Sequence, residues 1–217
     1  MGILTNTHPN KSKVVTLSYK KYWLINLTDH FKVWEFRCKD GSDTVKVDWF
    51  TVNALEAARK FFDLPLQITS AYRTESYNRK IGGAPGSYHT KGRAVDCYIG
   101  GLSPSLLAKF FEAYGMNGIG CYYDDLFVHV DSRENKFFWK NQGCVKVQTH
   151  LQTVRKGDSG RDVKDLQYIL NLHGEQLSVD GEFGEATYSA VKRFQKTRDL
   201  EVDGIVGKNT WKELFIK

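Results

Sequence analysis

The first domain of this sequence is built around the stretch Ser87-Tyr88-His89-Thr90-Lys91-Gly92-Arg93-Ala94-Val95-Asp96, followed later by Phe127-Val128-His129-Val130-Asp131. His89, Asp96 and His129 offer two imidazoles and one carboxylate, a donor set that suits zinc. Catalytic zinc typically has three protein ligands and one position for water, whereas structural zinc is usually closed by four ligands, often cysteines. The pattern therefore predicts a hydrolytic zinc centre.

The stretches around these residues predict short helices beside an antiparallel sheet, which is an α+β domain. A strand is expected over residues 66–72, and two strands over 117–122 and 126–131 form a hairpin. Ser103-Pro104 is typical of a helix start, with a serine cap and a proline in the first turn. An earlier helix is indicated by apolar residues at helical spacing, namely Val52, Leu55, Ala58, Phe61 and Phe62.

Composition limits the class of protein. The chain has 217 residues, enough for one large or two modest domains. No run of apolar residues is long enough for a transmembrane helix, and no secretory signal is visible at the start, so we expect no membrane insertion. The four cysteines are scattered without a CxxC pair, so free thiols are expected.

Charge and composition divide the chain into parts. We expect an irregular leader over residues 1–20, in which residues 14–17 could form an edge strand. A catalytic domain is expected over 21–140, a linker over 141–153 and a second domain over 154–217. The second domain carries 11 basic and 11 acidic residues, so the net charge of +6 comes entirely from the rest of the chain. This favours an anionic target, and bacterial cell wall is one such polymer.

The second domain contains an internal repeat, V-D-G-x-[FV]-G-x-x-T, at residues 179–187 and 202–210. Asp-Gly forms a tight turn, and the Gly-x-x-Thr that follows leads into a helix. Three helices, over 161–173, 185–198 and 208–215, are expected to form a small bundle. With Leu166-Gln167, Phe194-Gln195 and Trp211, this segment resembles the peptidoglycan-binding domain family, which implies attachment to peptidoglycan.

The pattern S-x-H-x-x-G-x-A-x-D of residues 87–96 resembles the zinc D-alanyl-D-alanine peptidase family, whose members cut D-amino-acid-containing peptides of the cell wall. Residues 31–38, 69–74 and 127–131 match other pieces in the family's order. The resemblance implies that His89, Asp96 and His129 are the zinc ligands. The residues agree, because Gly92 permits a turn that lets His89 on a loop meet Asp96 on a strand.

A base must take the proton from the attacking water, and Asp131 is the predicted residue. Residues two apart on a strand share a face, so Asp131 should lie beside His129, with Val128 and Val130 pointing into the core. Other branches of the family carry Glu or His just upstream of the last histidine, where this chain has Leu126 and Phe127. Two alternatives stay open: Asp124 or Asp125 is the base, or Asp131 orients a ligand histidine.

Arg73 is the predicted electrostatic partner of the substrate, either by clamping a peptide carboxylate or by stabilising the oxyanion. A structural salt bridge is the alternative for Arg73. From their positions in the motifs, Ser87, Tyr77 and Tyr122 are expected to line the cleft.

Together these features predict a zinc-dependent peptidoglycan peptidase held on the wall by its C-terminal domain. The alternatives are a D-alanyl-D-alanine carboxypeptidase and a non-catalytic wall-binding protein with a structural metal. Nucleic-acid binding is not expected, because basic residues are dispersed and no recognition motif is present. A monomer is expected, made in the cytoplasm and reaching the wall once the membrane is opened, as phage lysins do, or by non-classical release.

Overall fold

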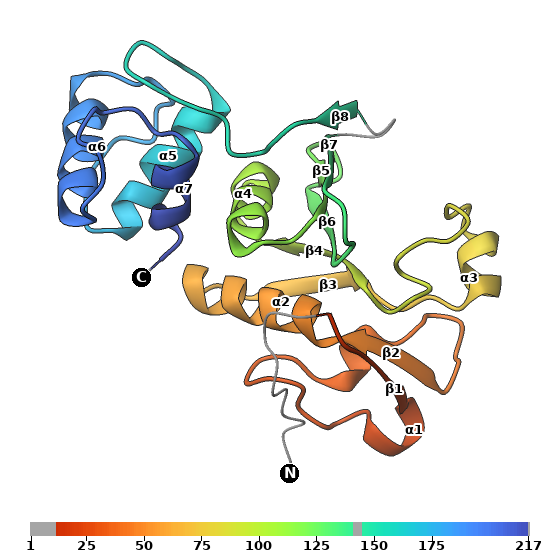
Figure 1. The fold of residues 1–217 in the computed structure, drawn as a ribbon. Coiled ribbons are helices and arrows are strands. Elements are labelled where there is room, and N and C mark those ends of the chain that lie inside the picture. The colour runs from red at the N-terminus through yellow and green to blue at the C-terminus, as the bar shows by residue number, and fades with distance from the viewer. Residues whose placement is uncertain (1–11, 141–144, 217) are drawn as a thin grey trace.

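The structure is a computed structural model that describes residues 12–140 and 145–216. Residues 1–11 of the expected leader and 141–144 of the expected linker lie outside the described residues. Figure 1 shows a central sheet, with helices α5, α6 and α7 gathered beside α4 and the small β1–β2 sheet at the opposite end. No helix in the described part of the chain has the length and apolar character needed to cross a bilayer.

The central sheet has six strands in the order β3-β4-β6-β5-β7-β8. Neighbouring strands are antiparallel, as predicted, except that β5 and β7 pair in parallel. The strands are β3 Leu66–Ser70, β4 Ala94–Ile99, β5 Gly118–Tyr122, β6 Phe127–Asp131, β7 Phe137–Lys140 and β8 Val145–Val147.

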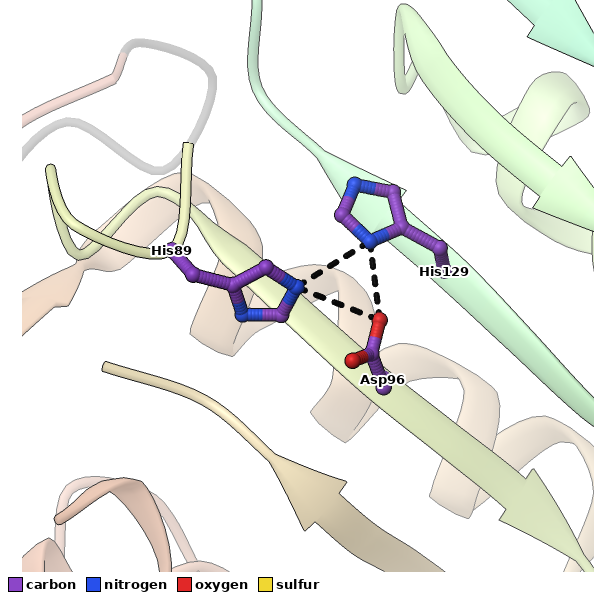
Figure 2. A group of neighbouring side chains, drawn as sticks. All are labelled: His89, Asp96 and His129. Atoms are coloured by element: carbon purple, nitrogen blue, oxygen red, sulfur yellow. Dashed lines mark hydrogen bonds and ion pairs between the residues drawn. The ribbon is translucent and has the colours of Figure 1, made fainter. Parts of the chain in front are cut away.

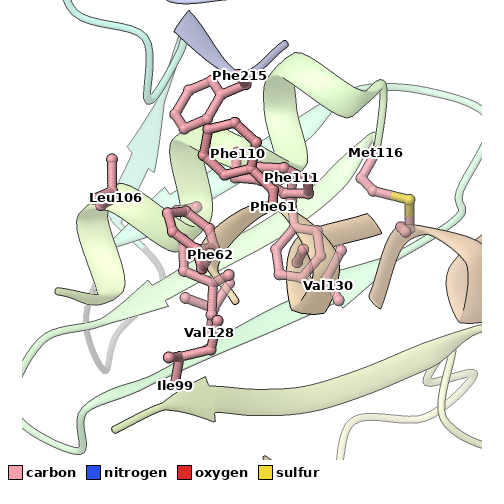
Figure 3. Close-up of a cluster of buried hydrophobic side chains, with 14 of the residues drawn as sticks. Phe61, Phe62, Ile99, Leu106, Phe110, Phe111, Met116, Val128, Val130 and Phe215 are labelled. Atoms are coloured by element: carbon pink, nitrogen blue, oxygen red, sulfur yellow. The ribbon is translucent and has the colours of Figure 1, made fainter. Parts of the chain in front are cut away.

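One face of this sheet packs on α2 (Trp49–Phe62) and α4 (Pro104–Tyr114). Strand alternation sends Val95, Cys97, Val128 and Val130 into that core, where all four are buried, as expected for the two valines that flank His129. Figure 3 shows part of this core between the sheet and the two helices. The opposite face, which does not pack on these two helices, carries Asp96 and His129.

Helix α4 begins where its sequence predicted. The Ser103 hydroxyl accepts a hydrogen bond from the backbone N–H of Leu106 at 3.0 Å, and Pro104 occupies the first turn. The helix ends at Gly115, whose φ of 106° is open to glycine at little cost. A third helix of this domain, α3 (Glu75–Lys80), precedes the loop that carries His89.

The N-terminal segment is more regular than the expected leader. Val14–Ser18 form strand β1, which pairs antiparallel with β2 (Thr44–Asp48), and the short helix α1 (Tyr19–Tyr22) follows directly. The edge strand therefore forms, because the side chains of Val15 and Leu17 pack against the core. The prediction of an irregular segment is therefore wrong for residues 14–20, which form β1 and the start of α1.

Much of the expected linker is also packed. Val145–Val147 extend the central sheet as β8. Beyond it, Thr149 donates to Glu112 at 2.6 Å, and His150 and Leu151 are buried. Burial lowers the pKa of His150 to about 4, so this ring is neutral at pH 7. The segment after residue 144 is thus part of the folded body.

The repeat of the C-terminal segment has a physical basis. Gln167 on α5 (Arg161–Leu172) accepts from the Gly181 N–H at 2.8 Å and donates to Asp180 at 2.7 Å. Gln195 on α6 (Glu185–Thr197) makes the equivalent bonds to Gly204 and Asp203. Each glutamine thus holds the Asp-Gly turn that precedes the next helix, ending with α7 (Lys208–Leu214).

The C-terminal helices dock on α4 through a buried ion pair and an aromatic cluster. The Lys109 ammonium, fully buried, lies 2.7 Å from Asp165 and 2.6 Å from Asp162 of α5. Phe215, just after α7, packs against Phe61 and Phe110, with ring centroids 5.7 and 5.6 Å apart (Figure 3). The two parts of the chain therefore share one apolar core.

We predict that Lys109→Met lowers the free energy of unfolding by about 3–5 kcal/mol, because it leaves the buried Asp165 carboxylate without its cation. Lys156→Met is the matched control, since Lys156 pairs with the exposed Glu185 at the surface, where ion pairs contribute little. Urea unfolding of both variants is the measurement. Equal losses in the two variants would contradict a structural role for the Lys109 pair.

Candidate metal centre

Three ligand atoms converge on one point of the free sheet face (Figure 2). The Nδ1 atom of His129 lies 2.8 Å from Asp96 Oδ1 and 3.2 Å from His89 Nε2, and His89 Nε2 lies 3.2 Å from Asp96 Oδ1. Asp96 and His129 meet because β4 and β6 pair in a register that places them opposite each other. The three residues that the sequence predicted to converge therefore lie together in the structure.

His89 reaches this point from a loop of turns between α3 and β4. The loop closes through Thr90, whose hydroxyl donates to the carbonyl of Ser87 at 2.8 Å. Gly92 adopts a φ of 70°, and a Cβ there would lie 2.4 Å from Lys46. Glycine is thus required at position 92 for both conformation and space.

Each ligand side chain is held by a second contact. His89 Nδ1 lies 2.7 Å from the Ala71 carbonyl, which can only accept, so Nδ1 carries the proton and Nε2 presents its lone pair. His129 Nε2 lies 3.1 Å from Asp131, which leaves Nδ1 directed at the centre. Arg73 donates to Asp96 Oδ2 at 2.7 Å, which leaves Oδ1 directed there as well.

The charges of the site follow from burial and these contacts. Burial lowers the pKa of His89, which keeps this ring neutral. Burial also opposes charge on His129, but hydrogen bonds to Asp131 and Asp96 outweigh it and raise the pKa of His129 to about 9. Burial acts to raise the pKa of Asp96, yet the two histidines hold it well below its usual range. Without a metal, His129 therefore holds a proton that a cation must displace.

These three residues fit zinc. Ligand atoms ~2.0–2.1 Å from one tetrahedral ion lie about 3.3 Å from one another. The observed separations of 2.8–3.2 Å are close to this value, so little rearrangement is needed. Only three side chains of this set converge among the residues that the structure describes, which leaves a fourth position for water or substrate.

Asp131 lies beside His129, as predicted, but on the side of the ring away from the ligand atoms. It contacts Nε2, whereas the ligand atom is Nδ1. It is fully buried and accepts from the side chain and backbone of Arg133 at 2.8 and 3.0 Å. Although burial would raise the pKa of Asp131, Arg133 and His129 lower it below its usual range. The geometry fits the orienting alternative better than the base.

The other predicted residues are placed in different ways. Arg73 forms the structural pair with Asp96 and also donates to Ser70 at 2.9 Å. Ser87 shapes the His89 loop, with its hydroxyl accepting from the His89 N–H at 3.3 Å. Tyr122 stacks on Phe127, and its hydroxyl accepts from Trp139 at 2.9 Å. Tyr77 belongs to α3, and Asp124 and Asp125 are exposed between β5 and β6.

Several residues of the site were not found from the sequence. Trp139 packs 5.2 Å from the His129 ring, and Arg133 holds Asp131. Trp139 and Asp131 need space on strand β5, where a Cβ on Gly120 would lie 2.3 Å from Trp139 and a Cβ on Gly118 would lie 2.1 Å from Asp131. Two glycines two apart in a strand were the available signal, because they mark close approach on one face.

Comparison with known proteins assigns both parts of the chain. Residues 29–131 match the family Peptidase M15, and residues 159–214 match the family described as putative peptidoglycan binding domain. These matches agree with the two resemblances found in the sequence.

Two curated relatives and one solved structure are similar over part of the chain. The zinc D-Ala-D-Ala carboxypeptidase of Streptomyces albus G is 41% identical over 34% of this chain and 29% of its own length. The peptidoglycan L,D-endopeptidase MepK of Escherichia coli K12 is 37% identical over a segment that covers 31% of this chain and 40% of its own length. The structure of the Burkholderia AP3 phage endolysin is 46% identical over a segment that covers 29% of this chain and 24% of the endolysin, with a TM-score of 0.29. The chain thus spans less than half of each of these proteins.

We predict that Gly120→Ala lowers the free energy of unfolding by about 1–3 kcal/mol, because the new methyl group displaces the Trp139 indole. Gly100→Ala is the matched control, since a Cβ there meets no atom within 4 Å. Urea unfolding and tryptophan emission are the measurements. An unshifted emission spectrum and unchanged stability in Gly120→Ala would contradict the packing described here.

Proposed function

We propose that this chain, which joins a Peptidase M15 domain to a C-terminal putative peptidoglycan-binding domain, is a zinc-dependent peptidase of bacterial peptidoglycan. The observation that carries the proposal is the convergence of His89, Asp96 and His129, each with its second contact fixed. A structural metal is a weaker reading, because three protein ligands leave the site open.

The proposed roles follow from the contacts. His89, Asp96 and His129 hold the zinc, which when bound polarises the scissile carbonyl and acidifies the attacking water. Asp131 is a positioning residue: it fixes the tautomer of His129 and stabilises its charge. Arg73 positions Asp96 through one nitrogen, and its remaining N–H groups provide positive charge beside the site for an oxyanion or a peptide carboxylate.

The proposed substrate is a peptide bond within the stem peptide or crossbridge of the wall polymer. The C-terminal domain supports this, since attachment to polymeric wall brings the peptidase to internal bonds. Removal of a terminal D-Ala is the second candidate, favoured by the likeness to the Streptomyces albus G carboxypeptidase. Ser87 and Tyr122 as cleft residues, a monomeric state and arrival at the wall after the membrane is opened belong to the same proposal.

Zinc removal tests the function. We expect the zinc-loaded protein to clear a suspension of purified peptidoglycan, a chelator to stop clearing, and added zinc to restore it. Mass spectrometry of the fragments separates internal cleavage from release of D-Ala. Because zinc must displace the proton that His129 holds below about pH 9, zinc affinity should rise by about tenfold per pH unit between roughly pH 6 and 8.

The controls for this test are His89→Ala, which should bind zinc poorly, and His30→Ala, which alters a histidine paired with Glu56 away from the centre. Activity that persists in metal-free protein, or in His89→Ala, would contradict the proposal.

Asp131→Asn distinguishes the positioning role from the base. For a positioning residue we expect zinc affinity to fall by about 10–100-fold, with turnover recovering at saturating zinc. If Asp131 is instead the base, we expect the variant to bind zinc but to remain without turnover even at saturating zinc. Asp125→Asn is the parallel variant for the rival base: loss of turnover with unchanged zinc affinity would assign the proton transfer to Asp125.

A further inference from the structure

A groove of about 760 Å³ lies at the end of the central sheet, between the hairpin tip and the loop that precedes α4. Tyr98, Leu102, Tyr123, Leu126 and Phe127 provide its apolar lining, and Arg161 of α5 provides a cation. Arg161 falls inside the region that matches the peptidoglycan-binding family, so both domains line this groove.

One part of the groove lies beside the metal centre on the same sheet face, and the rest turns around the end of the sheet toward α4 and α5. Tyr98 lies two residues after Asp96 on β4, and Phe127 lies two residues before His129 on β6, so both pairs share a face. Tyr98 is 37% exposed, and Phe127 is backed by the stacked ring of Tyr122 at 4.4 Å. A chain bound at the metal centre can therefore extend over these rings.

The hairpin tip presents an apolar side chain to the groove at a conformational cost. Leu126 has a φ of 56°, a region that L-residues other than asparagine and aspartate rarely occupy, and its side chain is 64% exposed. Strained residues of this kind cluster at ligand-binding sites. Burial of Leu126 under a bound chain would offset its exposure.

Arg161 is positioned by a contact of its own side chain and by the docking of its helix. Its guanidinium stacks on the Tyr123 ring at 3.8 Å, and burial raises the pKa of Tyr123 to about 12, so the hydroxyl keeps its proton. One helical turn further on, Asp165 is locked to the buried Lys109 of α4. Stacking occupies the face of the guanidinium and leaves N–H groups at its edge, the geometry that binds a carboxylate.

We propose that this groove binds the wall peptide beyond the bond that is cut, with Arg161 pairing with a carboxylate of that peptide. The inference rests on the proposed function and adds to it a specificity residue from the wall-binding domain. The groove lining holds the cation Arg161 and the anion Asp125, and the guanidinium is the group that can pair with a carboxylate. The bound peptide is therefore acidic.

The test varies charge on both partners. A synthetic wall-type stem peptide and its fully amidated analogue are titrated calorimetrically into metal-free protein, and KM and kcat for both are measured with zinc. In Arg161→Ala we expect the acidic peptide to bind about 10–100-fold more weakly, with KM raised and kcat retained, because a charged hydrogen bond is lost. The amidated peptide should bind the two proteins equally.

Lys164→Ala, which removes an exposed cation from the same helix outside the groove, is the matched control and should bind both peptides normally. Arg161→Lys should recover part of the affinity. Equal weakening for acidic and amidated peptides, or none, would overturn the proposal. Because wild-type activity is measured in parallel, absence of any cleavage by the zinc-loaded protein would instead count against the proposed function.

Discussion

The antiparallel pairing of β4 with β6 is the constraint from which the site follows, because it fixes Asp96 opposite His129 on the solvent side of the sheet. The same alternation places the flanking valines in the core, so a register shift of one residue would bury Asp96 and His129 and expose the valines. The hydrophobic effect therefore holds the register of a polar site. His89 needs only a loop to join the other two residues, and the turns around Gly92 supply it.

Hydrogen bonds and charges orient the side chains that the strand register brings together. Placing three charged or polar groups within 3.2 Å of one another is unfavourable unless each hydrogen points at a lone pair and no two lone pairs or hydrogens face each other. The Ala71 carbonyl, Asp131 and Arg73 impose this order, each from a different side. Arg133 offsets the cost of burying Asp131, and Gly118 leaves the space for it, so the support of His129 involves strands β5 and β6 and the loop that follows β6.

The sequence predicted those features that depend on local pattern. Alternation placed Asp131 beside His129, and the serine-proline pair placed the start of α4, both as observed. Alternation does not say which ring nitrogen of His129 faces Asp131, however, because that depends on the histidine rotamer, so pattern alone does not choose between the two roles considered for Asp131. Residues 145–153 show no local pattern of a folded segment, because their partners, such as Glu112, lie far away in the sequence.

The interface between the two domains depends on contacts between residues far apart in the sequence, such as Lys109 with Asp162 and Asp165. A buried ammonium is costly unless its carboxylates arrive with it, so Lys109 favours a docked α5 over any undocked arrangement. Under the proposed function, docking fixes the direction from which a wall strand held by the C-terminal domain approaches the metal centre. Attachment then raises the local concentration of only those bonds that the fixed geometry can reach. The C-terminal domain would then select the bond as well as the polymer, and the groove lined by both domains is the proposed place of that selection.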